Sequence, residues 1–410
     1  MSQVHVYVQP FDPDGNAYSG TWTEVTDDVE ISSLGKIKQY LDNTEYDVGV
    51  FRNSNLSVTF RNDHGKYSDA GEALSIFQYR RNGSQLKVTW EPGDVLLQPI
   101  FMRLGWTSMI SAEVELFRGL IKDEASKESF KDQKITFSVQ GFESIFNTVE
   151  VPVASLSIGN LISVVIYTCL NQADITDLLT VDQANIVCGT DLAVDAVDVF
   201  TNKTVLEMLK ELLLASNSVL YIDDDLNVIV SDRDESAALA YSFYGPDSTS
   251  GIENILAIED YRSGINRVIN YWTWTDTTLI KTDAASVSMN GIYKKDIDCD
   301  AITNTTKRNT ILENLAAEFC DKKIEMELLI PLTPTTAVIG LLDKINIDHP
   351  IMTLSPDGLP IAIYEIGQYD VHYYANEVAN ILISPSTYFK VIAKETDIKN
   401  DVITLTIREV

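Results

Sequence analysis

Three consecutive aspartates at residues 223–225 are the first feature of the sequence with the residue types of a metal site. A calcium loop would place oxygen ligands at alternate positions, here Asp223, Asp225 and Asn227. Such a loop then needs a glycine at its sharp bend and a glutamate at its end, and this sequence has a valine and an aspartate there. An apolar run typical of a strand follows at once. The pattern therefore favours a solvated hairpin turn over a metal site.

Other residues with catalytic chemistry are spread along the chain. Asp298 and Asp300 are the residue types of a glycosidase pair, but among 60 Asp and Glu residues such a pair arises by chance. The sequence contains no G-x-S-x-G, no glycine-rich phosphate loop and no H-E-x-x-H. The cysteines and histidines lack the spacing of a zinc or redox site; they are Cys169, Cys188, Cys299, Cys320, His5, His64, His349 and His372. We therefore expect no enzymatic activity, no cofactor and no bound metal.

Tryptophans exposed on strands are typical of carbohydrate-binding surfaces. The candidates are Trp22, Trp90, Trp106, Trp272 and Trp274. Burial in a core or in a subunit interface is the alternative for each of them. The strand pattern around Trp272 and Trp274 carries aromatic area on both faces, so we expect this strand to be covered on both sides or to face another subunit.

The composition of the 410-residue chain is that of a globular protein with a formal net charge of −29. Because nucleic-acid-binding surfaces need clustered Lys and Arg, this charge argues against specific binding of DNA or RNA. The acidity serves solubility, or it lines a space through which a polyanion passes without attachment. No apolar run has membrane-spanning length, and the first residues lack the regions of a signal peptide. We expect no stable membrane insertion.

The three aspartates belong to a helix-and-hairpin motif. Residues 204–215 combine one broad apolar face with a threonine and a glutamate at capping-box spacing. Strands are expected at residues 219–222 and 226–230, with the aspartates in the turn between them. We predict a structural role for the main residues of this motif: Thr204, Glu207, Leu209, Leu213, Tyr221, Asp223 and Asp225.

Strand patterns dominate both ends of the chain. They occur at residues 4–8, 22–25, 37–40, 46–51, 56–61, 86–90, 99–104, 113–121 and 134–140, and again at 267–275, 324–330, 344–347, 361–371, 378–383, 388–393 and 402–407. Further helices are expected at residues 158–170, where the β-branched Val164 and Ile166 would also fit a strand, and at 305–323. A linker is expected at 245–251. The sequence thus predicts a mainly β (α+β) protein. Its expected parts are a β-barrel-like domain at 1–150, a small α/β unit at 151–245 and a second β-barrel-like domain at 246–410.

This order of elements resembles the hub proteins at the tail tip, or baseplate, of tailed bacteriophages. Three stretches carry the resemblance: the helix and acidic hairpin at 204–233; the succession from Asn266 and Arg267 through 286–293 and a helix to LLIPLTP at 328–334; and GLLDKINI at 340–347. Residues 48–69 and 116–123 also resemble the first domain of such tail-tip proteins.

The resemblance implies a homotrimer in the virion, made in the host cytoplasm, whose two tube-type domains per subunit form a pseudo-sixfold ring. Its partners would be the tail tube or distal tail ring protein on one side and a tail fibre or spike on the other, with DNA passing through the ring. Carboxylates facing the channel would keep DNA sliding, and neighbouring subunits would cover edge strands. Two alternatives stay open: a hexameric distal tail adaptor, and a β-rich carbohydrate- or receptor-binding module.

Overall fold

The computed structural model describes most of the chain. The described residues are 3–12, 17–18, 21–41, 52–67, 84–91, 113–129, 131–173, 175–176, 178–223, 225–233, 238–245, 255–262, 268–275, 277–321, 323–348 and 387–409. The strands expected at 46–51, 99–104, 361–371 and 378–383, and most of the linker expected at 245–251, lie outside these residues.

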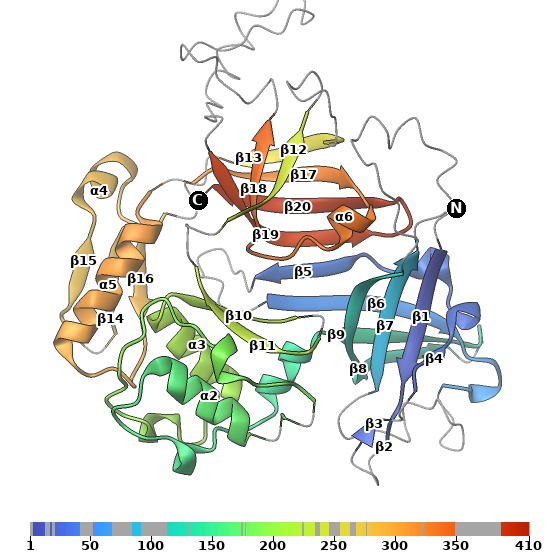
Figure 1. Cartoon of the computed structure of the whole chain (residues 1–410), viewed down its shortest axis with the longest axis horizontal. Helices are drawn as coiled ribbons and strands as arrows, with labels where there is room; N and C mark the ends of the chain where they lie inside the picture. The colour runs from blue at the N-terminus through green and yellow to red at the C-terminus, as the bar shows by residue number, and fades with distance from the viewer. Residues whose placement is uncertain are drawn as a thin grey trace, which may run out of the picture.

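One sheet of thirteen strands dominates the fold (Figure 1). Its strands are β1 (Gln3–Gln9), β4 (Thr23–Glu24), β5 (Ile37–Leu41), β6 (Arg52–Arg61), β7 (Gln85–Glu91), β8 (Val114–Ser129), β9 (Lys134–Gln140), β12 (Leu239–Tyr244), β13 (Ala257–Arg262), β17 (Glu325–Pro331), β18 (Lys344–Asp348), β19 (Tyr388–Asp397) and β20 (Val402–Glu409). The main path runs β13-β17-β20-β19-β5-β6-β9-β8-β7-β1-β4, and β18 joins it beside β19 and pairs with β12. The predicted mainly β fold class is confirmed. Among the described residues the sheet does not close into a barrel, because the paired path ends at β13 and β4.

The junction between β5 and β19 joins the two ends of the chain. These strands pair antiparallel, with Tyr40 opposite Ala393 and Ile37 opposite Thr396. Every strand on the β4 side of the junction comes from before residue 141. Every strand on the other side comes from after residue 238. The N-terminal and C-terminal strands are therefore parts of one sheet, as the blue and red strands of Figure 1 show.

Alternating side chains of this sheet build one hydrophobic core. On β9, Ile135, Phe137 and Val139 are buried and the residues between them are partly exposed, as the sequence alternation predicts. The rings of Phe60 and Phe137 have centroids 5.1 Å apart, and the ring of Tyr67 lies 5.0 Å from that of Phe60. The same core includes side chains of β17, β19 and β20, so both parts of the sheet are stabilised by one continuous apolar cluster.

A second core belongs to a mixed α/β part, drawn at the lower left in Figure 1. It contains the helices α2 (Ile162–Gln172) and α3 (Val205–Ala215), the hairpin of β10 (Ser218–Ile222) and β11 (Val228–Asp232), the sheet of β14 (Tyr271–Trp274), β15 (Ile280–Thr282) and β16 (Lys294–Ile297), and the helices α4 (Ala284–Asn290) and α5 (Thr305–Phe319). Apolar residues from 269–319 share this core with residues from 142–230. A segment from the last third of the chain thus packs against the middle of the chain, whereas the sequence pattern grouped it with the final strands.

Short elements complete the described residues. They are the two-stranded sheet of β2 (Phe11–Asp12) and β3 (Ala17–Tyr18), the helix α6 (Pro334–Ala337), and the 3-10 helices η1 (Thr26–Asp28), η2 (Ile31–Ser33), η3 (Asp63–Gly65), η4 (Phe142–Asn147), η5 (Val153–Ser155), η6 (Gln183–Asn185) and η7 (Asp198–Phe200). In the part of the chain described here, no helix has the length and apolar character needed to cross a membrane.

Candidate functional site

The aspartate turn between β10 and β11 uses its own carboxylate as a hydrogen-bond acceptor. Asp223 Oδ1 accepts from the backbone N–H groups of Asp225 (3.0 Å) and Asn227 (2.8 Å). The side-chain amide of Asn227 donates to Asp223 Oδ2 at 2.9 Å. These bonds are those of an Asx turn. Within the described residues, which exclude Asp224, no group of three or more His, Cys, Asp or Glu side chains is placed to hold a metal ion.

The helix that precedes this turn begins with the expected capping box. The Thr204 hydroxyl accepts from the Glu207 N–H at 3.2 Å, and the Glu207 carboxylate accepts from the Thr204 N–H at 2.7 Å. Leu209 and Leu213 are fully buried in the α/β core. Tyr221 lies on β10 opposite Ile229 of β11. All of these contacts lie within the motif or its core.

Trp272 and Trp274 lie inside the α/β core, with 0% and 2% of their surface exposed. The Trp272 Nε1–H donates to the Ile269 carbonyl at 3.0 Å, and the Arg308 guanidinium lies 4.8 Å from the Trp274 ring centroid. The sequence left two alternatives for this strand, which were cover on both sides by the chain itself or contact with another subunit. In the structure the chain itself covers both faces of the strand. As placed, these two side chains are not available to a glycan or to a second subunit.

Trp90 and Trp22 also offer little exposed aromatic surface. Trp90 is 4% exposed. Trp22 is partly exposed, but its ring has Lys87 Nζ at 4.9 Å and the Arg118 guanidinium at 5.7 Å from its centroid. Trp106 lies outside the described residues.

The cysteine thiols are poor nucleophiles. Burial raises the pKa of Cys169 and of Cys299 to about 12 and that of Cys188 to about 11. A thiol with such a pKa is almost entirely protonated at neutral pH, whereas the thiolate is the reactive form. The exposed Asp298 and Asp300 flank the buried Cys299 at the end of β16.

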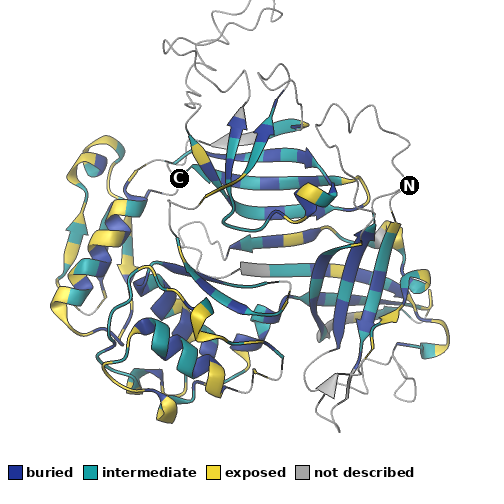
Figure 2. Ribbon diagram, viewed as in Figure 1, coloured by how far each residue is buried: buried dark blue, intermediate teal, exposed yellow. Residues whose placement is uncertain are grey.

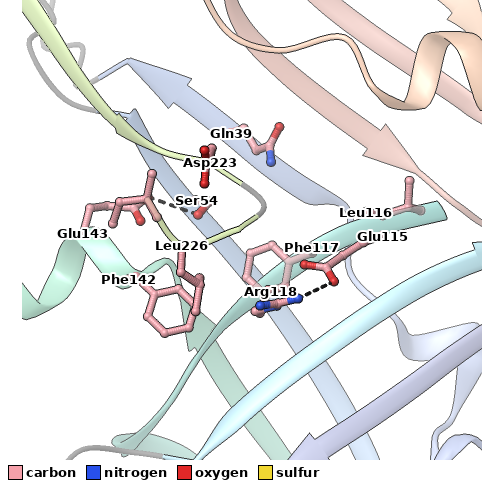
Figure 3. A pocket seen from close by; sticks show the side chains of 11 residues that line it. Gln39, Ser54, Glu115, Leu116, Phe117, Arg118, Phe142, Glu143, Asp223 and Leu226 are labelled. Atoms are coloured by element: carbon pink, nitrogen blue, oxygen red, sulfur yellow. Dashed lines mark hydrogen bonds and ion pairs between the residues drawn. The ribbon is translucent and has the colours of Figure 1, made fainter. Parts of the chain in front are cut away.

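A small pocket lies where the hairpin turn meets the main sheet (Figure 3). Its lining includes Ser54 of β6, Arg118 of β8, Glu143 of η4 and Asp223 of the turn. Glu143 accepts from the Ser54 hydroxyl at 3.1 Å, and Arg118 pairs with Glu115 at 2.8 Å. Its volume of about 40 Å³ holds a water-sized molecule, whereas pockets for organic ligands measure roughly 300–1,000 Å³. Its polar groups join two parts of the chain and leave no room for a substrate.

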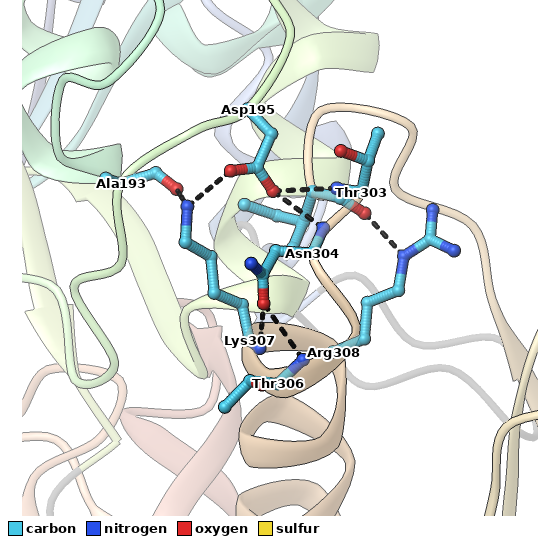
Figure 4. Close-up of polar contacts among 8 residues, drawn as sticks. Ala193, Asp195, Thr303, Asn304, Thr306, Lys307 and Arg308 are labelled. Atoms are coloured by element: carbon cyan, nitrogen blue, oxygen red, sulfur yellow. Dashed lines mark hydrogen bonds and ion pairs between the residues drawn. The ribbon is translucent and has the colours of Figure 1, made fainter.

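A polar clamp joins the middle of the chain to α5 (Figure 4). The Asp195 carboxylate accepts from the backbone N–H groups of Thr303 (2.9 Å) and Asn304 (2.8 Å), at the start of α5. Lys307 Nζ donates to Asp195 Oδ1 and to the Ala193 carbonyl, both at 2.5 Å. Partial burial disfavours the ionised Asp195, but the Lys307 ammonium and these hydrogen bonds outweigh it and lower the pKa of the carboxyl group.

An extended polar surface lies on the side of the sheet that faces away from its core, across the β5–β19 junction. We call it the open face. It is formed by outward side chains of β20, β19, β5, β6 and β9, strands whose outward positions are partly or fully exposed (Figure 2). They include Thr404, Thr406, Glu395, Lys38, Tyr40, Asn55, Ser57, Thr59, Thr136 and Ser138. The register also places the charged side chains of Arg61, Lys134 and Asp397 on this side, so hydroxyl and amide groups alternate here with charges of both signs.

Ion pairs join three lysines and two carboxylates on and beside the open face. Glu395 on β19 binds Lys36, just before β5, and lies 3.3 Å from Lys38 Nζ. Lys134 on β9 lies 2.5 Å from Glu30, whose backbone N–H donates to the Thr59 carbonyl of β6. Partial burial opposes the ionisation of Glu395, but Lys36 and Lys38 outweigh it and lower the pKa of its carboxyl group. No sequence motif marks these residues, because Lys36 and Glu395 meet only when the two ends of the chain pair.

Comparison with known proteins extends these observations. No protein-family model and no curated protein matches the sequence. Among solved structures, the tail protein from Neisseria meningitidis MC58 matches all of this chain and 96% of its own, with a TM-score of 0.54 and 11% identity. The 43 kDa tail protein of prophage MuSo2 from Shewanella oneidensis matches 99% of this chain and 96% of its own, with a TM-score of 0.49 and 10% identity. The first likeness is a likeness of fold over the whole length, so the predicted resemblance to tail proteins is confirmed for the fold.

Proposed function

We propose that this protein is a non-enzymatic structural component of the tail tip or baseplate of a phage virion. The observation that carries the proposal is the continuous sheet across β5 and β19, in a chain whose whole length has the fold of a tail protein. A sheet assembled from both ends of the chain gives one protomer two β parts side by side. The comparison supports this role through the fold alone. A fold by itself does not determine function, so the role is tested below by experiment.

The finer proposal is a homotrimeric hub. Three copies would contribute six β parts to a pseudo-sixfold ring, and the β5–β19 pairing would join the two parts within each protomer. The tail tube or distal tail ring protein would bind on one side of the ring and a fibre or spike on the other, while DNA passes through the opening. Neighbouring copies would cover sheet ends such as β13, which would otherwise present unpaired backbone groups.

The solution mass of the purified protein tests the hub. We expect a particle of three 45.7 kDa chains that does not dissociate on dilution, with a central opening in negative-stain images. A hexamer would favour the distal tail adaptor. A monomer that binds glycans on an array would favour the receptor-binding module, and either result would refute the trimeric hub.

A further inference from the structure

The main sheet and the α/β part have separate hydrophobic cores, and they meet along the β10–β11 hairpin, where β10 lies near β6 (Figure 1). At the turn end of the hairpin, Asp223 lines the polar pocket with side chains of the sheet. At the other end, the Arg233 N–H donates to the Asn217 carbonyl at 3.4 Å, and the ammonium group of Lys390 on β19 donates to the Arg233 carbonyl. The five residues of β10 place these ends roughly 17 Å apart. The hairpin thus contacts the sheet at two separate places.

The two places differ in chemistry. At the turn end, the pocket lining includes the apolar side chains of Phe117, Phe142 and Leu226. Leu120 of β8 is buried in the α/β core together with Phe142. This attachment is therefore partly apolar, and separating it would expose hydrophobic surface to water.

The other end carries a cluster that we call the charged latch. It comprises Arg233, Glu318 and Phe319 of the α/β part, and Glu325 and Arg408 of the main sheet. The guanidinium carbons of Arg233 and Arg408 lie 5.7 and 5.5 Å from the centroid of the Phe319 ring. Arg233 Nη1 lies 4.0 Å from Glu318 Oε1, and Arg408 Nε lies 3.8 Å from Glu325 Oε1. One cation from each part of the chain thus lies against the same aromatic ring.

These charges are largely buried. The side chains of Arg233 and Glu318 are 10% and 20% exposed, and those of Arg408 and Glu325 are 18% and 7% exposed. Burial opposes the charge of Arg233 most strongly, Arg408 adds repulsion, and Glu318 offsets these effects only in part, so the pKa of the Arg233 guanidinium falls to about 10. Further charged residues lie next to the latch in sequence or in strand register: Asp232, Arg262, Lys344, Lys390 and Glu409.

Such a cluster holds two parts together without making their separation costly. The attraction within a buried ion pair is largely offset by the desolvation of its charges, and separation lets water solvate them again. Here separation also relieves the repulsion between Arg233 and Arg408. We propose that the charged latch is a releasable joint: when it opens, the α/β part turns about its attachment at the Asp223 end of the hairpin while both cores stay intact. The inference concerns a single protomer and does not depend on the proposed trimer.

Neutralising the two carboxylates tests the latch. Glu318→Gln/Glu325→Gln keeps side-chain size and leaves the two arginines without the carboxylates that hold them together. Adding Arg408→Gln to this double variant removes the repulsion. The matched control is Glu30→Gln, since Glu30 is 27% exposed and pairs with Lys134 on β9 at 2.5 Å, among the N-terminal strands.

The distance between the two parts is measured by pulsed electron paramagnetic resonance. Spin labels are attached at Lys38→Cys of β5 and Glu313→Cys of α5, whose native side chains are 54% and 58% exposed. Cys188→Ser removes the partly exposed native thiol, and the other three cysteines are buried. Chains with the label sites are co-produced with an excess of chains that lack them, so that most particles hold one labelled chain. Melting curves verify that each variant is folded.

We expect one distance population in the unmodified latch and in Glu30→Gln, and a second population in the double variant. Removing one partner of a buried ion pair shifts an equilibrium about 100-fold or more, so the ratio of open to closed molecules should rise by at least that factor. Adding Arg408→Gln should return most molecules to the closed distance, which a general loss of stability would not do.

Three results would overturn the releasable joint. They are a double variant that keeps the single distance, a second population that persists after Arg408→Gln is added, and an equal second population in Glu30→Gln. If the double variant does not fold, the single variant Glu318→Gln carries the same comparison, because its carboxylate is the more exposed of the two.

Discussion

Leu209→Ala in the middle of α3 is the sharpest test of the α/β core. Leu209 is fully buried there beside Met208, Leu212 and Leu213. Truncating a buried leucine to alanine costs about 2–5 kcal/mol, more where the surroundings cannot collapse into the cavity. Because α3 packs against α2, β10 and η4, we expect a loss of about 3 kcal/mol or more in the free energy of unfolding.

The size of the melting shift then reports which part of the chain unfolds together. If the α/β core melts as a unit of roughly 150–250 residues, a loss of 3 kcal/mol lowers its Tm by about 6–12 °C. If the whole chain melts as one unit, the shift is smaller, because the entropy of unfolding grows with size. Urea and thermal unfolding followed by tryptophan fluorescence suit this question, since Trp272 and Trp274 lie in the same core.

The matched control for this experiment is Lys210→Ala, the next residue of the same helix, whose side chain is exposed. Its effect should stay within about 0.5 kcal/mol of zero. Leu209→Asp, which would bury an unpaired charge, should unfold the α/β core or abolish the proposed trimer. Equal unfolding midpoints for Leu209→Ala and Lys210→Ala would refute the burial of this helix face.

Three further predictions concern polar groups. Thr204→Ala removes half of the capping box and should destabilise the protein by about 1 kcal/mol in urea unfolding; an unchanged midpoint would count against the cap. Asp195→Ala should cost about 1–3 kcal/mol because it leaves backbone donors and Lys307 without their acceptor, whereas the exposed Asp198→Ala serves as the neutral control. The folded-state pKa of Asp195 is lowered, so its contribution is present above the ordinary aspartate pKa of about 3.9 and should vanish as the pH falls below it. His5 lies 2.8 Å from Glu24, and this hydrogen bond raises the pKa of its imidazole against partial burial. The stability difference between wild type and His5→Gln should therefore be full below about pH 6.5 and disappear as the pH rises through the raised pKa; a difference that grows with pH would contradict this pairing.

Local patterns in the sequence predicted the elements whose causes are local. The capping box and apolar face of α3 follow from residues three and four positions apart, and the alternation of β9 follows from residues two apart. The turn at Asp223 is likewise formed by hydrogen bonds to residues two and four positions away. In each case the interacting groups are neighbours in the chain, so the order of residue types is enough to specify the contact.

Long-range assembly was beyond the reach of these patterns. The pairing of β5 with β19 joins residues near 40 to residues near 395, and no periodicity within either strand selects its partner. The α/β core likewise includes residues 269–319, which are distant in sequence from its other members. Asp195 meets Lys307, and Trp272 becomes buried, only in the folded chain. Residue type and spacing specify local hydrogen bonds and the side of each element that is buried, but which buried sides meet depends on the packing of the whole chain. For this protein, composition revealed a chain rich in carboxylates, and only tertiary structure decided that strands from its two ends share one sheet.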